Sequence, residues 1–474
     1  MMKTATPLWT SQDAAQAVGG DVPHAWAATG VSINTRTLKP GDLFIALVGP
    51  NADGHDHVAS AFEKGAAAAC VSHRPPVLDP DAALLVVDDT QRALEDLGRA
   101  ARARTTARVI AVTGSVGKTG TKEALKAVLS AQGKTSASEG SLNNHWGLPL
   151  SLARTPADAD FAVLEMGMNH PGELTVLSKM ARPHVCLITT IAPAHTAFFA
   201  NTAEIADAKA EIFAGIEPGA VAVLNADIAE RQRLVDAASA AGIERIVTFG
   251  ESIEADFRVI AYSLNATGSD VTALTPVGRV EYAIASPGRH WVVNSLGVLA
   301  AVYAAGGDVA RAAASLADVT PPSGRGEQFA VALNGGTFTL IDESYNASPA
   351  AVRASLAVLG AQPLSPGSRR IAVLGDMLEL GDDTATMHAE LANALTANNI
   401  DTAYLAGEAM IHLWNAMPTR MRGHLSATSD LLSNVVVNAV RPGDVVMVKG
   451  SAGSRMGVVV NKLKALGETM KGKN

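Results

Sequence analysis

The chain has 474 residues with a formal net charge of −8, and 48% of its residues are hydrophobic but only 4% aromatic. This length exceeds one ordinary core and, at roughly 100–200 residues per domain, predicts about three domains. The negative charge disfavours a nucleic-acid partner, which usually leaves a basic footprint, and two cysteines, Cys70 and Cys186, are too few for a disulfide framework or a cysteine-rich zinc site.

Residues 1–104 alternate short apolar runs with stretches of helical pattern. The runs are DLFIALVG, AAAACVS and ALLVVDD, and the segment ends in the basic helical stretch RALEDLGRAARART. The first residues, MMKTATPLWTSQDAAQAVGG, lack a continuous apolar stretch, and no part of the chain approaches 18 uninterrupted apolar residues. We therefore predict a first α/β domain over 1–104 and a cytoplasmic protein without a membrane span.

Residues 105–320 repeat the alternation with longer apolar runs, namely ARVIAVTG, FAVLEMG, VCLITTI, AVAVLNAD and RIVTFG. Near-continuous apolar strands separated by helices indicate a parallel sheet covered on both faces. Polar and apolar residues alternate in FRVIAYSLNATGSDVTALTP and RVEYAIASPG, which predicts an antiparallel insert. A Pro/Gly break, TPPSGRGE, then precedes a third α/β block over 321–474 that contains FTLIDES, RRIAVLGD, TAYLAG and DVVMVKGS.

The stretch AVTGSVGKT at 111–119 resembles a phosphate-binding loop, although Val112 stands where the usual G-x-x-x-x-G-K-[ST] pattern has glycine. An apolar strand precedes the glycines, and TKEALKAVLSAQ predicts a helix just after Lys118. Backbone N–H groups and the positive end of the helix dipole would then face a bound anion. The Lys118 ammonium would interact with the phosphates, and the Thr119 hydroxyl would ligate Mg²⁺. The alternative is an ordinary turn with a surface lysine.

Two further polar residues follow neighbouring apolar strands. Glu165 ends FAVLE, and His195 lies in TTIAPAHTAFF. Because the carboxyl ends of parallel strands open on one crevice, we expect Lys118, Glu165 and His195 to converge. Carboxylate oxygen is a preferred ligand of Mg²⁺. The alternatives are a solvated strand-end glutamate and a loop histidine with ordinary hydrogen bonds.

Several phrases resemble the central domain of the Mur ligase family: TGSVGKT, NNHWGLPL, EMGMNHPGE, AHTAFF and IADAKAEIF. The resemblance covers nearly the whole chain, because NTRTLKPGDLFIALVGPNADGHDH, GRGEQF, DESYNASP, LGDMLELG and KGSAGSRM also match. It implies an α/β protein of three domains: an N-terminal UDP-binding domain, a central doubly wound P-loop-type ATPase domain and a C-terminal Rossmann-like domain.

The resemblance also implies a reaction, in which ATP phosphorylates a substrate carboxylate and an amine attacks the acyl phosphate to form an amide. DESYNASP and LGDMLELG look most like the members that add D-alanyl-D-alanine to UDP-N-acetylmuramoyl-tripeptide in peptidoglycan synthesis. The implied cofactors are ATP and Mg²⁺. We expect a monomer that has no membrane span and does not bind nucleic acid.

The family pattern implies roles for individual residues. Nucleotide contacts are expected from Gly114, Ser115, Val116, Gly117, Lys118, Thr119, Gly120, Asn143, Asn144, Asn294, Arg325 and one or both of Asp342 and Glu343. The expected metal ligands are Thr119, Glu165, His195 and Lys209, and the expected catalytic residues are Lys118, Glu165, His195 and Lys209. Asn34, Thr35 and Arg36 are expected at the UDP-sugar, although Asn34 replaces the usual aspartate, and Arg455 is a candidate whose surrounding pattern departs from that of relatives.

Lys209, in IADAKAEIF, matches a lysine that the family carbamylates with CO₂ to give an anionic oxygen ligand for Mg²⁺. Carbamylation requires a neutral amine, which a buried lysine of lowered pKa supplies. The alternative is a solvated helix lysine, the usual state of this residue type.

Three other functions remain open. A folylpolyglutamate synthase-like ligase shares the ATP chemistry but lacks the first, UDP-binding domain. Another Mur ligase is the second alternative, although the Asp-Asn-Pro-Arg phrase of the diaminopimelate-adding members is absent. The third is a switch or scaffold that binds ATP without ligation.

Overall fold

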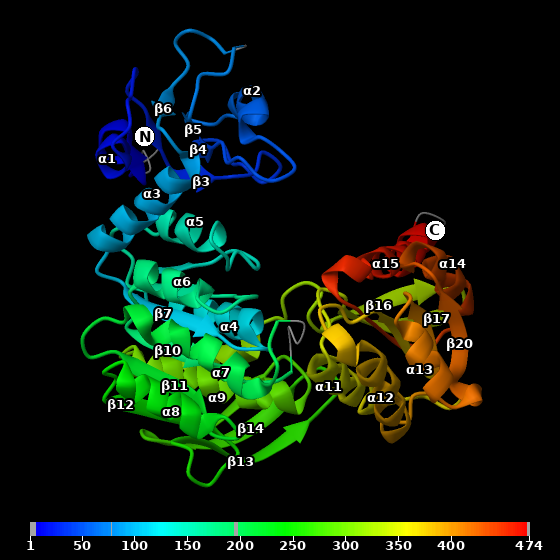
Figure 1. Cartoon of the computed structure of the whole chain (residues 1–474). Helices are drawn as coiled ribbons and strands as arrows, with labels where there is room; N and C mark the ends of the chain where they lie inside the picture. Colours follow the sequence, from blue (N-terminus) through cyan, green and yellow to red (C-terminus); the bar gives the residue numbers. More distant parts are fainter. Residues whose placement is uncertain (1–5, 77, 194–197, 472–474) are drawn as a thin grey trace. The chain divides into compact units, whose positions relative to one another are not determined.

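A computed structural model of the chain describes residues 6–76, 78–193 and 198–471. The chain divides into two compact units. Figure 1 shows their helices and strands, coloured along the sequence from blue to red. The first unit consists of the chain up to Thr113, Gln132–Cys186 and Glu211–Val221. The second consists of Gly114–Ala131, Leu187–Ala210 and the chain from Ala222 onward.

The first unit begins with a small α/β block built on a four-stranded parallel sheet of order β3-β4-β5-β6. Its elements are β1 (Trp9–Thr10), α1 (Ser11–Val18), β2 (Ala27–Ala28), β3 (Gly30–Ser32), β4 (Asp42–Ile45), η1 (Gly54–His57), α2 (Val58–Glu63), β5 (Ala68–Val71), β6 (Leu84–Val86) and α3 (Thr90–Arg104). Asp89 caps α3 by accepting from the amides of Gln91 and Arg92. The helix buries Leu94, Leu97 and further residues of one face against the sheet, which confirms the predicted α/β alternation.

The remainder of the first unit contributes parallel strands, of which β7 and β9 are buried along nearly their whole length and β8 is only partly buried. β9 pairs with β7 on one side and β8 on the other. The elements are β7 (Arg108–Thr113), β8 (Thr135–Ala137), α5 (Gly147–Ala153), β9 (Phe161–Glu165), α6 (Glu173–Ala181) and η2 (Glu211–Gly215), and β10 (Val185–Ile188) follows α6. These strands belong to a nine-stranded sheet of order β15-β14-β13-β12-β11-β10-β7-β9-β8.

The second unit contains the helix that follows the glycine-rich stretch and the other strands of the large sheet. Its first elements are α4 (Lys118–Ser130), α7 (Thr202–Ala210), β11 (Val221–Asn225), α8 (Arg231–Ala240), β12 (Arg245–Gly250), β13 (Phe257–Leu264), β14 (Ser269–Thr275), β15 (Gly278–Ile284), α9 (Arg289–Ala304), α10 (Val309–Ser315) and η3 (Leu316–Asp318). Strands β13, β14 and β15 pair antiparallel, which confirms the predicted insert.

The C-terminal part of the second unit is a six-stranded sheet of order β16-β17-β21-β18-β19-β20. Only the β16–β17 pair is antiparallel. Its elements are β16 (Glu327–Leu333), β17 (Gly336–Glu343), α11 (Pro349–Gly360), β18 (Arg370–Gly375), η4 (Gly381–Asp383), α12 (Thr384–Ala397), β19 (Thr402–Ala406), α13 (Met410–Ala416), η5 (Thr419–Met421), β20 (Arg422–Ser426), α14 (Ser429–Ala439), β21 (Val445–Lys449), η6 (Ala452–Ser454) and α15 (Gly457–Lys471).

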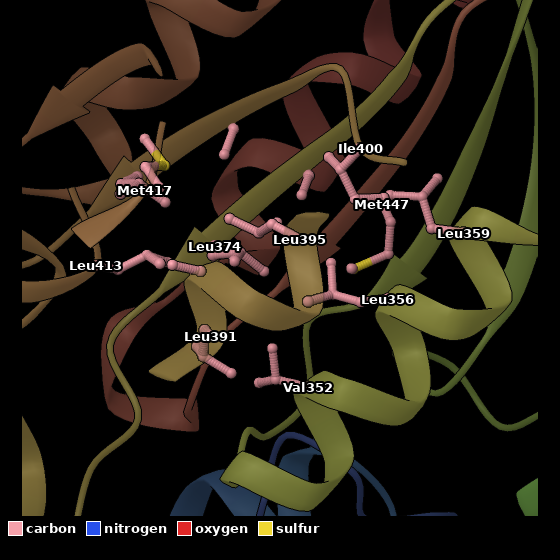
Figure 2. Packing of buried hydrophobic residues seen from close by; sticks show 14 of the residues in the cluster. Val352, Leu356, Leu359, Leu374, Leu391, Leu395, Ile400, Leu413, Met417 and Met447 are labelled. Carbon is pink, nitrogen blue, oxygen red and sulfur yellow. The ribbon is translucent and has the colours of Figure 1, made fainter. Parts of the chain in front are cut away.

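Both faces of this C-terminal sheet are covered. One face packs Leu374 and Met447 against Leu356, Leu391 and Leu395 of α11 and α12 (Figure 2). The opposite face packs against α14 and α15, so the strands are buried on both sides. A parallel sheet between two helical layers is the Rossmann-like arrangement that was predicted.

Both cysteines are free and fully buried, Cys70 in β5 and Cys186 in β10. Burial raises the pKa of the Cys70 thiol to about 12, and burial likewise raises the pKa of Cys186. Within the described ranges, no helix combines the length and the apolar character that crossing a bilayer requires.

Candidate nucleotide and metal site

The glycine loop, Gly114–Gly120, follows β7 and leads into α4. Gly114 and Gly117 both have positive φ values, 146° and 90°. A Cβ atom on Gly114 would lie 2.0 Å from Oγ1 of Thr189, and one on Gly117 would lie 2.9 Å from Nδ2 of Asn294. Only glycine fits these two positions, because other residues would add both backbone strain and a clash.

Hydrogen bonds tie the glycine loop to the residues that follow β10. The Ser115 amide donates to the carbonyl of Thr190 at 2.9 Å, and the Thr189 hydroxyl donates to the carbonyl of Val116 at 2.6 Å. The Asn225 side chain, at the end of β11, donates to the carbonyl of Thr189 at 2.9 Å. The loop is therefore held in shape by protein contacts. Sequence reasoning missed Thr189 and Asn225, because a polar residue after a strand carries no distinguishing pattern.

Lys118 is the first residue of α4 and is partly buried, so it is not the surface loop lysine that the sequence allowed. Its ammonium donates to the carbonyl of Gly114 at 2.6 Å. Gly117, at the N-cap of α4, has no side chain with which to cap the helix. The amides of the first helical turn and the Lys118 charge together make this helix terminus electropositive, which is the property that the predicted phosphate site requires.

Lys209 lies in α7 with only 2% of its surface exposed. Burial, and then the positive charge of Lys118, hold the pKa of Lys209 well below its usual range. Burial at this position contradicts the alternative of a solvated helix lysine and favours the neutral amine. The second unit thus brings together the glycine loop, Lys118, Lys209 and Asn294.

Glu165, in the first unit, is the last residue of β9 and is 1% exposed. Its Oε1 accepts from Nδ2 of Asn143 at 2.8 Å, and its amide donates to Oγ of Ser138 at 3.2 Å. Its Oε2 is buried and has no hydrogen-bond partner among the described residues. An unpaired buried carboxylate oxygen is costly unless a cation or a donor binds it. The solvated glutamate considered from the sequence is therefore wrong.

A magnesium ion fits this carboxylate. Mg²⁺ typically takes one or two carboxylates and completes its octahedron with phosphate oxygens and water, so it does not need a cage of protein ligands. The described part of the chain holds no cluster of three His, Cys, Asp or Glu side chains arranged for a metal. His195 lies outside the described residues.

The two predicted asparagines have different partners. Asn143 binds Glu165, as above, whereas Oδ1 of Asn144 accepts from the amides of Trp146 at 3.1 Å and Gly147 at 3.0 Å. Asn144 therefore caps the start of α5.

The residues expected at the UDP-sugar form a turn shortly after β3. Oδ1 of Asn34 accepts from the amide of Arg36 at 3.0 Å and from its Nε at 3.3 Å. The ammonium of Lys64 donates to the carbonyl of Thr35 at 2.9 Å. The turn leaves the Arg36 side chain exposed, as a group that binds an anionic ligand would be.

The predicted nucleotide residues of the C-terminal part lie around β17. The Arg325 guanidinium stacks 4.0 Å from the ring centre of Tyr345. Oδ1 of Asp342 accepts from the Ser344 hydroxyl at 2.6 Å.

The second acid, Glu343, has a buried cation as its partner. Oε2 of Glu343 accepts from the ammonium of Lys449 at 3.1 Å, and only 4% of the Lys449 side chain is exposed. Sequence reasoning missed Lys449, although it lies in the quoted phrase KGSAGSRM. Arg455 is exposed and has a left-handed backbone, with φ 53°.

Three descriptions of protein families match the chain in order. The "Mur ligase family, catalytic domain" matches residues 27–108, the "Mur ligase middle domain" matches 112–302, and the "Mur ligase, glutamate ligase domain" matches 324–452. A relative from Rickettsia prowazekii, named UDP-N-acetylmuramoyl-tripeptide--D-alanyl-D-alanine ligase, is 32% identical over 456 residues. That match covers 96% of this chain and 99% of the relative.

Two solved structures resemble the chain over nearly its full length. A MurF crystal structure from Acinetobacter baumannii is 29% identical with a TM-score of 0.82, covering 97% of this chain and 99% of that one. A MurF ligase from Thermotoga maritima, solved in complex with ADP, shares the fold at 24% identity and a TM-score of 0.75, covering 93% of this chain and 98% of that one.

Proposed function

The chain belongs to the Mur ligase family, and on that premise we propose that it joins D-alanyl-D-alanine to UDP-N-acetylmuramoyl-tripeptide with consumption of ATP. The observation that carries this function is the match over 96% of the chain to a relative of that name, which includes the N-terminal region. The product is an amide, and the reaction belongs to peptidoglycan precursor synthesis.

The chemistry requires activation, because a free carboxylate is a poor acyl donor. Transfer of the γ-phosphoryl group of ATP gives an acyl phosphate with phosphate as its leaving group, and the amine of the dipeptide then attacks the acyl carbon. Positioning and charge stabilisation account for most catalysis of this kind. The glycine loop, with its helix-terminal amides and the Lys118 ammonium, is suited to holding the phosphates.

Magnesium would offset the negative charge of the phosphates. We propose Oε2 of Glu165 as a ligand because it is a buried carboxylate oxygen without a hydrogen-bond donor among the described residues. The Thr119 hydroxyl and a carbamylated Lys209 are further proposed ligands, and the burial of Lys209 supports the neutral amine that carbamylation needs. His195 stays a prediction from the family pattern.

The remaining assignments are proposals of the same kind. Residues 1–104 would bind the UDP-sugar through Asn34–Arg36, residues 105–320 would bind ATP, and residues 321–474 would bind the dipeptide and close the nucleotide site. The nucleotide would be contacted by Asn294 on its adenine side, by Arg325, and by either Asp342 or Glu343. We further propose a cytoplasmic monomer with no nucleic-acid partner.

The folylpolyglutamate synthase-like alternative is disfavoured, because residues 27–108 match a Mur ligase description in the region which that class lacks. The ligase proposal is tested by incubating the protein with ATP, UDP-N-acetylmuramoyl-tripeptide and D-alanyl-D-alanine and measuring the product mass. Phosphate release should require both the sugar peptide and the dipeptide. If phosphate release did not depend on one or both of these substrates, the result would favour an ATP-binding switch and contradict the proposal.

A further inference from the structure

The bridge loop, residues 138–146, connects β8 to α5 within the first unit. Two of its side chains, Leu142 and Trp146, pack against the hydrophobic core of the N-terminal block. The Trp146 ring lies beside Gly49, where an added Cβ would be 3.3 Å from the ring. The Gln91 side chain of α3 donates to the carbonyl of His145 at 3.2 Å. This side of the bridge loop is therefore fixed to the N-terminal block.

Other residues of the bridge loop hold Glu165. Ser138, at one end, accepts from the Glu165 amide, and Asn143 donates to Oε1 of the carboxylate. The Gly167 amide donates to the Asn143 carbonyl at 2.9 Å, so the backbone on both sides of Glu165 is bound to the loop. The direction in which Oε2 points therefore depends on where the bridge loop lies.

Arg154, at the C-cap of α5, links the loop to β3. Its Nε donates to the carbonyl of Val31 at 2.6 Å, and its Nη1 donates to Oε2 of Glu139 in the bridge loop, also at 2.6 Å. Val31 lies in β3, shortly before the Asn34–Arg36 turn, and 22% of the Arg154 side chain is exposed. A planar guanidinium can make two such bonds in fixed directions, which a lysine cannot.

We propose that Arg154 is a positioning residue for the ligation reaction. By binding Val31 and Glu139 together, it holds the bridge loop in the place where Asn143 and Ser138 orient the Glu165 carboxylate toward its cation. The role of the cation rests on the proposed function, whereas the effect on the loop does not. Arg154 acts through the loop, so its loss should resemble the loss of a group that orients a metal ligand.

The first test uses hydrogen exchange in the metal-free Arg154→Ala protein. The amides of Glu165 and Gly167 are bonded to the bridge loop, so they should exchange at least about tenfold faster than in the wild type if the loop opens locally. In the ligation assay, the Mg²⁺ concentration for half-maximal rate should rise about tenfold or more, the usual effect of removing a group that orients a metal ligand. Added methylguanidinium should restore part of both properties.

The matched control is Arg231→Ala. Arg231 lies in the second unit and donates to Glu254 at 2.7 Å, its side chain is 33% exposed, and neither residue belongs to the bridge loop. It should leave both the exchange rates and the Mg²⁺ dependence unchanged. A second variant, Glu139→Ala, removes the bond from Arg154 to the bridge loop but keeps the bond to Val31, and it should change both readouts in the same direction by a smaller factor. This second variant tests the proposal if Arg154→Ala does not fold.

Wild-type exchange at Glu165 and Gly167 in Arg154→Ala would overturn the proposal, and so would a loosened loop with unchanged Mg²⁺ dependence. If Arg154→Ala does not fold, wild-type behaviour of Glu139→Ala would overturn it. A wild-type protein that makes no product from the three substrates would overturn the proposed function instead. That result would leave the exchange measurement as a separate test of the loop.

Discussion

The ammonium group of Lys118 donates a hydrogen bond to the carbonyl oxygen of Gly114, 2.6 Å away, across the glycine loop. The side chain therefore lies over the loop and is already placed beside the amides of the first turn of α4. A cation held in this position needs little rearrangement when phosphate binds, so its charge is available to the transferring phosphoryl group.

Replacing Lys118 should abolish ligation while leaving the fold intact. We expect Lys118→Ala to lower kcat by at least about 100-fold, the usual effect of removing one preorganised group that stabilises the transition state. The melting temperature should change little, because a partly buried lysine at a helix start contributes little to the core. Lys126→Ala, on the exposed face of the same helix, is the control. A Lys118→Ala enzyme with near wild-type turnover would remove the nucleotide-loop assignment.

The close contact at Gly114 predicts a second effect. Gly114→Ala should destabilise the protein by at least about 2 kcal/mol for two reasons. The new methyl group would clash with the Thr189 hydroxyl, and alanine is strained at the positive φ of this position. Gly172→Ala separates the two causes, because Gly172 has a φ of 91° with open space around its Cβ position. It should lose only about 1 kcal/mol. Urea unfolding measures both, and equal losses would show that the contact with Thr189 is unimportant.

His184 predicts a dependence of stability on pH. Burial, and then the charge of Arg108, lower its pKa to about 4, and its Nδ1 accepts from the Val109 amide at 3.0 Å. The unfolded chain therefore binds a proton near pH 6.5 while the folded chain does not. The contribution of His184 to the free energy of unfolding should be complete above about pH 6.5. It should be lost progressively as the pH is lowered from there to about 4.

The variant His184→Asn keeps an acceptor for the Val109 amide and removes the titration. Its free energy of unfolding should be flatter between pH 6.5 and 4 than that of the wild type, as measured by urea unfolding at several pH values. Parallel pH curves for the two proteins would exclude His184 as the cause.

The proposed carbamylation of Lys209 can be tested, because a carbamate supplies a negative charge and an unmodified lysine a positive one. If a carbamate forms there and ligates Mg²⁺, Lys209→Ala should lose at least about 100-fold in kcat, and added formate or acetate should restore part of it by placing an anionic oxygen in the vacated space. Lys209→Met fills that space and should show no restoration. Full activity of Lys209→Ala without additive, or a loss that carboxylates cannot relieve, would contradict the carbamate.

The sequence predicted the features that follow from local pattern. Long apolar runs such as the one ending at Glu165 indicated buried parallel strands, and the polar–apolar alternation around 257–284 indicated the antiparallel insert. Gly114 and Gly117 were identifiable because glycine spacing near a helix start is itself a signal.

Other features depend on tertiary contacts and could not be read from the chain. Nothing in IADAKAEIF shows that Lys209 is buried, because that depends on the elements packed around α7. The unpaired oxygen of Glu165 depends on which atoms surround the end of β9. The hydrogen bonds from the Trp146 and Gly147 amides to Asn144 likewise depend on the folded shape of the loop before α5. The partners of Thr189 and Arg154 are distant in sequence, so only the folded chain reveals them.

The burial of Cys70 and Cys186 has a practical consequence for labelling. Alkylating reagents and oxidants attack the thiolate, and both native thiols are enclosed and held in the protonated form. A cysteine introduced at an exposed position, such as Val48 with 61% of its surface accessible, should therefore be modified selectively by a maleimide dye. The native chain can thus carry a single fluorophore beside Gly49 and Trp146 without prior removal of its own cysteines.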